Sequence, residues 1–331
     1  MRYNARLFGG IFFILLFIFL IIESPWSKRI RAPKKIKITD FKISDIARIE
    51  MKSKDKEFIL TKKDEKWFLQ RYDTIFLPVD SARIDRTLKA FENLEGEVVG
   101  TNPKDFNLYQ VEEENGIHIK AYNAKGNILL DFFVGKMGPD FSSNYVRLNN
   151  KNEIVLVEKY IRGDFPLYKL SWIDKRLTNF KAEDVVKFKH NFGENFVVVK
   201  KDGRFYFEND TVKLDSTRTI QYLRMISNII AMDIIDTISI KDAGLLEPAG
   251  IFDIEMKDGT YHSIIFGNNT GEGGVYYVTN KNKKYVYTLS KTYVDNALKK
   301  TKDYFLGKTE GPEIIEKPFK KFGKPKKPLK K

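Results

Sequence analysis

The amino-terminal part of the chain is dominated by an unbroken apolar run from Leu7 to Ile22. As a helix these residues span about 24 Å, and their flanks extend that length toward the roughly 30 Å of a hydrocarbon core, because Glu23 is the only charge between Arg6 and Lys28. A cleaved signal peptide is the alternative, but no pair of small residues follows the run, as signal peptidase requires. We therefore expect a single membrane-spanning helix.

After this run the pattern changes to short segments in which apolar and polar residues alternate, as in half-buried strands. An apolar stripe at Ile84, Leu88, Phe91 and Leu94 predicts one helix, and Asp80 stands where its N-cap would lie. The predicted strands are Ile46–Lys52, Glu57–Thr61, Lys66–Gln70, Gly116–Tyr122, Asn127–Gly135, Asn144–Leu148, Glu153–Val157, Gly250–Met256, Tyr261–Gly267, Gly274–Thr279 and Lys284–Leu289.

Two stretches of the chain share these motifs in the same order, at an offset that falls from 139 to 130 residues. Such self-similarity indicates two copies of one unit. The matching segments are Phe41-Lys42 with Phe180-Lys181, Trp67-Phe68-Leu69 with Phe205-Tyr206-Phe207, Asp80-Ser81 with Asp215-Ser216, Lys125-Gly126 with Asp258-Gly259, and Phe133-Val134-Gly135 with Ile265-Phe266-Gly267.

Strands gathered around a single helix predict the α+β class with mainly antiparallel sheets. We expect two tandem homologous modules, each with one principal helix, after the transmembrane helix. The predicted divisions are 1–35 (anchor and basic flank), 36–178 (first module), 179–306 (second module) and 307–331 (a Lys/Pro-rich tail). With few apolar residues to bury, that tail is predicted to be disordered.

The net charge of +14 is concentrated at the two ends of the chain. Residues 1–35 carry seven Lys/Arg against one Glu, and residues 307–331 carry nine Lys against three Glu. The nearly neutral middle argues against a nucleic-acid-binding protein. The tail either contacts anionic lipid or only improves solubility. The absence of cysteine excludes disulfides, thiolate metal sites and thiol nucleophiles.

The sequence offers few groups for catalysis. The three histidines, His118, His190 and His262, have no second histidine or carboxylate at the spacing of metal ligands, so we expect no metal and no cofactor. Asp80 and Asp215 occupy equivalent positions and are predicted to be helix caps, although an acid–base pair across a module interface is the functional alternative.

Aromatic side chains provide the remaining candidate site. Tyr276, Tyr277, Tyr285 and Tyr287 cluster in the last predicted hairpin, and Tyr145 with Arg147 lies on the matching strand of the first module. Alternating strand positions would allow them to form a ligand or partner face, although half of such positions must face the core.

In their order, these motifs resemble the bacterial family called domain of unknown function 4340. The matching segments are Trp67-Phe68-Leu69, the helix led by Asp80, Phe133-Val134-Gly135, Tyr145-Val146-Arg147 and Gly244-Leu245-Leu246-Glu247-Pro248. The second copy has Tyr276-Tyr277-Val278 in place of Tyr-Val-Arg, so any role of the arginine belongs to the first module alone. The resemblance implies a membrane-anchored extracytoplasmic protein without assigned activity, often encoded beside an ABC transporter of the gliding-motility type.

These observations predict a non-enzymatic, single-pass inner-membrane protein that acts as a binding or scaffold component of a cell-envelope complex with an ABC transporter. The alternative is an envelope enzyme or carbohydrate-binding protein acting on glycan or lipid. Five Lys/Arg between Lys28 and Lys35 follow the apolar run, which by the positive-inside rule favours a cytoplasmic body. Because the resemblance favours export and long domains translocate against such a bias, we expect a periplasmic body.

Overall fold

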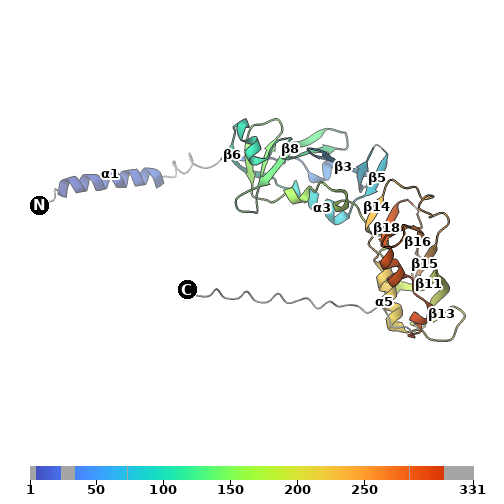
Figure 1. The fold of residues 1–331 in the computed structure, drawn as a ribbon. Helices are drawn as coiled ribbons and strands as arrows, with labels where there is room; N and C mark the ends of the chain where they lie inside the picture. The colour runs from blue at the N-terminus through green and yellow to red at the C-terminus, as the bar shows by residue number, and fades with distance from the viewer. Residues whose placement is uncertain (1–4, 24–33, 73, 283, 309–331) are drawn as a thin grey trace, which may run out of the picture. The chain divides into compact units, whose positions relative to one another are not determined.

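The computed structural model of the chain describes residues 5–23, 34–72, 74–282 and 284–308. The chain divides into two compact units, Met1–Asp174 and Lys175–Lys331, and each combines an antiparallel sheet with a few helices (Figure 1). The predicted α+β class is therefore confirmed. The structural division lies slightly before the predicted one, and the predicted tail lies outside the described residues from residue 309 onward.

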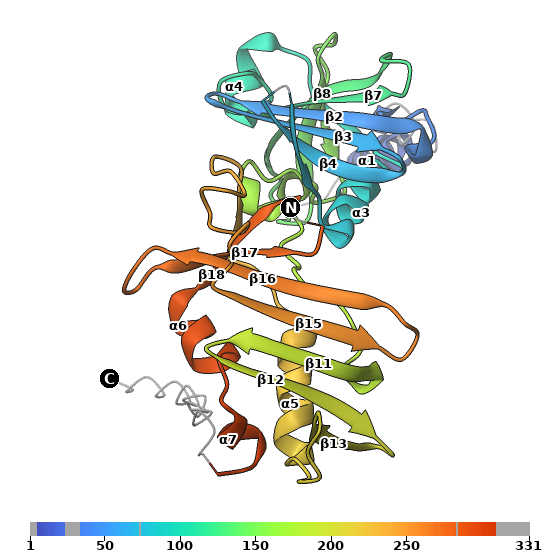
Figure 2. The ribbon, with the colours of Figure 1, turned by 90° about the vertical axis from the view of Figure 1, so that its right-hand side faces the viewer.

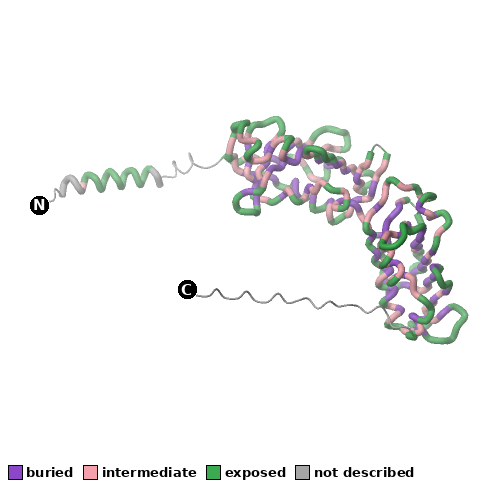
Figure 3. The backbone as a smooth tube through the Cα atoms, viewed as in Figure 1, coloured by how far each residue is buried: buried purple, intermediate pink, exposed green. Residues whose placement is uncertain are grey.

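The apolar run forms helix α1 (Ala5–Glu23). Side chains are described for residues 9–21, and every residue from Ile11 to Ile21 is a large apolar one that is exposed (Figure 3). No helix formed by the described residues reaches the length and apolarity needed to cross a membrane.

The first unit contains a ten-stranded sheet in the order β1-β6-β10-β9-β8-β7-β2-β3-β4-β5. Its strands are β1 (Lys35–Lys37), β2 (Ile46–Ser53), β3 (Lys56–Lys63), β4 (Lys66–Arg71), β5 (Ile75–Pro78), β6 (Glu95–Gly100), β7 (Ile117–Asn123), β8 (Ile128–Met137), β9 (Asn144–Leu148) and β10 (Ile154–Val157). Its helices are η1 (Ile43–Asp45), α3 (Ser81–Ala90), η2 (Pro103–Asp105), α4 (Phe106–Tyr109), η3 (Arg162–Asp164) and η4 (Lys169–Ser171).

The core of this unit lies between the sheet and helix α3. Alternation along β8 turns Phe132 toward α3, where its ring lies 6.1 Å from that of Phe91, the C-cap residue. Phe133 points to the opposite side, which we call the outer face of the sheet. The predicted helical stripe is too long, because α3 ends at Ala90 and Leu94 is buried beyond it, after a left-handed turn at Asn93.

The second unit contains an eight-stranded sheet in the order β13-β12-β11-β15-β16-β17-β18-β14. Its strands are β11 (Val185–Phe192), β12 (Glu194–Lys201), β13 (Arg204–Phe207), β14 (Asp233–Ile235), β15 (Gly250–Met256), β16 (Tyr261–Asn269), β17 (Val275–Asn280) and β18 (Val286–Ser290). Its helices are η5 (Ala182–Asp184), α5 (Ser216–Ser227), α6 (Lys291–Tyr293), the π-helix η6 (Val294–Leu298) and α7 (Lys302–Phe305).

Helix α5 covers one face of this second sheet (Figure 2). Its Tyr222 packs 5.5 Å from the ring of Phe188 on β11, and its hydroxyl donates to the carbonyl of Leu298 at 2.8 Å. Phe305 on α7 meets the same tyrosine at 5.2 Å. The segment after β18 therefore returns to close the core around α5.

The two sheets order their strands in the same way. The first, from β4 to β6, runs β4-β3-β2-β7-β8-β9-β10-β6, and each strand has a counterpart at the same place in the second. The matching strands β8 and β16 each contain a bulge, at Gly135 and at Gly267. A Cβ atom on Gly135 would lie 2.2 Å from the carbonyl oxygen of Tyr109, and one on Gly267 would lie 2.1 Å from that of Ala243. Only glycine allows this close approach.

Candidate functional site

One row of side chains crosses four strands on the outer face of the first sheet. The register places Lys52 of β2 beside His118 of β7, His118 beside Phe133 of β8, and Phe133 beside Arg147 of β9. The corresponding row of the second unit is Asn191, Ile251, Ile265 and Thr279. The second sheet has the same topology but no charged residue in this row. The fold itself therefore does not require the charges, and the row of the first unit is the candidate site.

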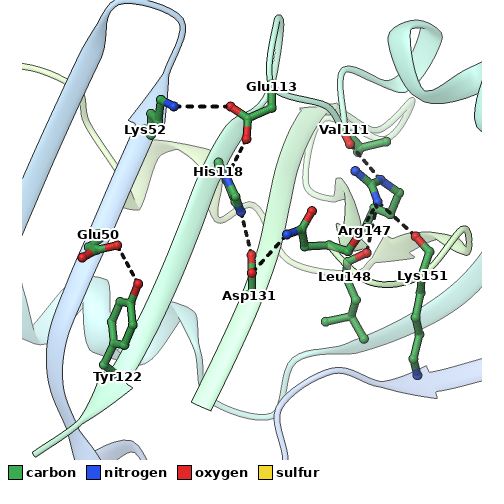
Figure 4. A network of polar contacts seen from close by, with 11 residues as sticks. Glu50, Lys52, Val111, Glu113, His118, Tyr122, Asp131, Arg147, Leu148 and Lys151 are labelled. Carbon is green, nitrogen blue, oxygen red and sulfur yellow. Dashed lines mark hydrogen bonds and ion pairs between the residues drawn. The ribbon is translucent and has the colours of Figure 1, made fainter. Parts of the chain in front are cut away.

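His118 is the centre of a polar network that also contains Glu113, Asp131 and Lys52 (Figure 4). Asn149 joins this network through Asp131. Its Nδ1 lies 3.1 Å from Glu113 and its Nε2 lies 2.6 Å from Asp131, while its ring stacks on Phe133 at 4.3 Å. A neutral imidazole donates to only one of these carboxylates, whereas an imidazolium donates to both. Each ring nitrogen of His118 therefore has a carboxylate partner.

The surrounding residues fix both carboxylates. Asn149 donates its side-chain amide to Asp131 at 3.1 Å, and the ammonium of Lys52 lies 3.8 Å from Glu113. The Glu113 side chain is 61% exposed but that of Asp131 only 23%, so solvent screens the first contact more strongly. The two carboxylates lie on opposite sides of the ring, and the described residues contain no group of three His, Cys, Asp or Glu side chains able to hold a metal ion.

Arg147 extends the row at its far end. Its Nε donates to the carbonyl of Val111 at 2.9 Å, and its Nη1 lies 3.0–3.2 Å from the carbonyls of Leu148, Asn149 and Lys151. The guanidinium also lies over the rings of Phe106 and Phe133, at 4.2 and 4.7 Å from their centroids. Burial lowers the pKa of Arg147. This buried cation is thus held by carbonyl dipoles and aromatic faces.

Together, His118 and Arg147 attach the segment from Val111 to Glu113 to the sheet. Val111 is fully buried against Phe133 and Ile154, so an apolar contact lies between the two polar ones. On the neighbouring strands, Tyr122 donates to Glu50 at 2.7 Å, and burial together with this bond raises the pKa of Tyr122 to about 12. The ionisable groups of the row contact neighbouring carboxylates and backbone carbonyls, an arrangement suited to holding a surface in place.

Each of the two candidate carboxylates caps a helix. Asp80 accepts a hydrogen bond from the backbone N–H of Arg83 at 2.8 Å at the N-cap of α3, and Asp215 accepts one from Arg218 at 3.0 Å at the N-cap of α5. Each aspartate therefore satisfies an otherwise unpaired amide of its own helix, in its own unit.

The tyrosines do not form one exposed face. Tyr276 and Tyr287 are each only 4% exposed, since their strand positions turn them into the core. Tyr277 points the other way and packs on the buried cluster of Ile265 and Val286, and half-buried Tyr285 lies 6.4 Å from Tyr287. Tyr145 packs at 4.6 Å against Tyr109. Tyr276 and Tyr287 are therefore core residues, and the prediction that they belong to a ligand or partner face is wrong.

None of the site residues predicted from the sequence belongs to the polar network around His118. Asp131 does not stand at the sequence spacing of a metal ligand from His118, because it reaches His118 across a hairpin. Counting outward from the turn at Lys125-Gly126 brings residues 118 and 131 to neighbouring positions on one face. The pairing register of this hairpin is therefore the feature of the sequence from which the contact could have been predicted.

Of three comparisons with known proteins, one finds a match. No significant match exists among the curated proteins or among the solved structures. A family model described as Domain of unknown function (DUF4340) matches residues 67–248. This match covers 182 of 331 residues, from β4 in the first unit into the second. The chain therefore belongs to the DUF4340 family.

Proposed function

We propose that this protein is a membrane-anchored binding or scaffold component of a cell-envelope complex. The observation that carries the proposal is helix α1, in which every side chain from Ile11 to Ile21 is apolar and exposed. An exposed apolar surface on all sides of a helix is stable in lipid and costly in water. The helix anchors the two units to the inner membrane, with both in the periplasm.

The polar network on the first sheet supports a scaffold rather than a catalyst. His118 contacts a carboxylate at each ring nitrogen, and Arg147 is enclosed by four carbonyl oxygens. Groups so engaged hold the outer surface of the sheet rigid. The matching strand order of the two units supports a duplicated module, which gives the complex two related binding surfaces.

The anchor is tested by replacing Leu15 and Phe17 with arginine in the full chain. Each charge near the centre of a spanning helix costs about 2.5–3.5 kcal/mol, so the variant is expected in the supernatant after carbonate extraction of membranes. Leu246→Arg is the matched control, because this exposed apolar residue belongs to a folded unit and its replacement leaves the protein in the pellet. Carbonate resistance of the double variant would contradict the anchor.

The proposed partner is an ABC-transporter assembly of the envelope, as the family resemblance suggests. The test is affinity purification from membranes in mild detergent, followed by mass spectrometry. Transporter subunits are expected to co-purify with the wild-type chain and to be lost with the double-arginine variant. Digestion of the two units by protease added to spheroplasts tests the periplasmic orientation; protection of both units would contradict it.

A further inference from the structure

A pocket of about 580 Å³ opens at one end of the second sheet. It lies beside η5 and the turn joining β15 to β16, and this volume is typical of small-molecule sites. Phe180, Met256 and His262 form its apolar base, with the rings of Phe180 and His262 stacked at 5.0 Å. Lys181 and Lys257 stand exposed at its rim.

His262 brings hydrogen-bonding capacity to this base. Among the described residues it has no hydrogen-bond partner, although it is half-buried. Burial lowers the pKa of His262, the nearby ammonium of Lys281 lowers it further, and Asp258 opposes the change. The neutral ring therefore presents one donor and one acceptor in surroundings of positive potential.

The rim carries two ammonium groups that are available to a ligand. Lys181 and Lys257 form no ion pair with any described residue. Asp258 already accepts a hydrogen bond from the backbone N–H of Thr260 at 2.8 Å, and the Thr260 hydroxyl also lowers the pKa of Asp258. Asp184 is the other carboxylate of the lining. Among the described residues, the lining therefore contains two lysines without an ion pair and two aspartates, of which Asp258 is already engaged by the turn.

The first unit has a pocket of about 560 Å³ at the corresponding place, beside η1 and the turn joining β7 to β8. Its lining contains neither histidine nor an aromatic residue, and three carboxylates there face two lysines. One of those lysines, Lys62, pairs with Glu65 at 2.6 Å. The lining of this pocket is thus more acidic than that of the second unit, and the pocket of the first unit is an internal control.

We propose that the pocket of the second unit binds a small anionic ligand, a phosphate or carboxylate attached to a ring. Lys181 and Lys257 bind the anionic group, and the ring packs against Phe180 and His262. Charge-assisted hydrogen bonds supply much of the affinity, while the aromatic base selects a ring over a bare anion. This site is independent of the proposed membrane anchoring, so neither hypothesis depends on the other.

The test follows the histidine ring signals of the detergent-solubilised full chain by nuclear magnetic resonance, with isotope label in its three histidines. Three probes separate the contributions: phenyl phosphate supplies ring and anion, inorganic phosphate the anion, and phenol the ring. Phenyl phosphate is expected to shift the His262 signals saturably and to raise the pKa of His262, with weaker binding of inorganic phosphate and none of phenol. His118 and His190 should not respond.

Matched variants in the two pockets test whether phenyl phosphate binds in the pocket of the second unit. Lys181→Gln with Lys257→Gln is expected to weaken phenyl phosphate binding by about tenfold for each lysine. Lys62→Gln with Lys125→Gln in the pocket of the first unit should leave it unchanged. Absence of a saturable shift at His262, equal binding of phenol and phenyl phosphate, or equal loss in both double variants would each overturn the proposal.

Discussion

His118 and Asp131 make a diagonal contact across strands β7 and β8: the Nε2 atom of His118 lies 2.6 Å from Asp131, although the register pairs His118 with Phe133. Diagonal neighbours on one face of an antiparallel pair are within reach of long side chains. Glu113 meets the other ring nitrogen from a loop. The two carboxylate contacts of one histidine therefore differ in burial and in rigidity.

Double-mutant cycles of unfolding free energy should separate these two contacts. For His118→Gln with Asp131→Asn we expect a coupling energy of about 1–3 kcal/mol, because this pair is largely buried. For His118→Gln with Glu113→Gln we expect less than about 1 kcal/mol, because water and salt screen the exposed carboxylate. Urea denaturation measures both cycles, and equal couplings would contradict the difference in burial.

Arg147→Lys should destabilise the first unit by about 2–4 kcal/mol. Lysine keeps the positive charge but cannot reproduce the guanidinium fork that contacts four carbonyl oxygens, so buried acceptors lose their partners. Arg48→Lys is the control: the Arg48 side chain is 44% exposed, and we expect a loss of less than about 1 kcal/mol. Similar losses in the two variants, measured by chemical denaturation, would show that the carbonyl cage is unimportant.

His190 should make the stability of the second unit sensitive to acid. It is fully buried between the rings of Phe196 and Phe252, and burial lowers the pKa of His190. Its Nε2 has no hydrogen-bond partner among the residues that the structure describes. The unfolded chain therefore binds a proton below about pH 6.5 that the folded chain does not bind, so stability falls as the pH decreases through that range.

His190→Phe removes this titration while filling the same aromatic slot. The variant should lose less stability than wild type between pH 7.5 and 5.5, with a difference of at most about 1.4 kcal/mol per pH unit. Thermal unfolding at several pH values measures this difference, and His262 contributes equally to both proteins. Parallel curves for wild type and variant would count against a titration of His190.

Gly135→Ala and Gly267→Ala should each destabilise their own unit by about 3 kcal/mol. The added methyl group would meet a backbone carbonyl oxygen at little more than 2 Å, and a backbone cannot retreat as a side chain does. Gly100→Ala is the control, because its Cβ would meet only the side chain of Ile154 at 3.5 Å. We expect it to change stability by less than about 0.5 kcal/mol, and a comparable loss in all three variants would refute the steric argument.

The sequence predicted elements whose pattern is local. Hairpins such as β15–β16 combine alternation with a turn at Asp258-Gly259, and Asp80 and Asp215 identify helix starts because capping requires only neighbouring amides. Strands β1, β5, β6 and β14 were missed because they are short or glycine-containing, and all of these except β5 pair only with distant segments. For β6, these are β1 and β10. Strands β11, β12 and β13 have no predicted range of their own, although the repeat matches parts of this region.

Part of the candidate site could be predicted from the sequence. Hairpin counting places Asp131 near His118, but nothing local to Glu113 or Val111 reveals that their loop folds back over β7 to β9. That path depends on the buried contact of Val111 with Phe133 and Ile154, which only the tertiary structure establishes. The core positions of Tyr276 and Tyr287 likewise follow from which face of the sheet α5 and the returning segment cover.

The shared strand order has a consequence for how the chain folds during synthesis. In each unit the middle of the sheet joins strands far apart in sequence: Ile49 pairs with Ala121, 72 residues later, and Phe188 with Ile254, 66 residues later. Closing such long loops is slow, and it cannot begin until the later strand has left the ribosome. The first unit needs no segment beyond Asp174, so it can complete its sheet while the second is still being translated. Ribosome-bound chains stalled after residue 210 should then already resist protease in the first unit, whereas chains stalled before residue 117 should not.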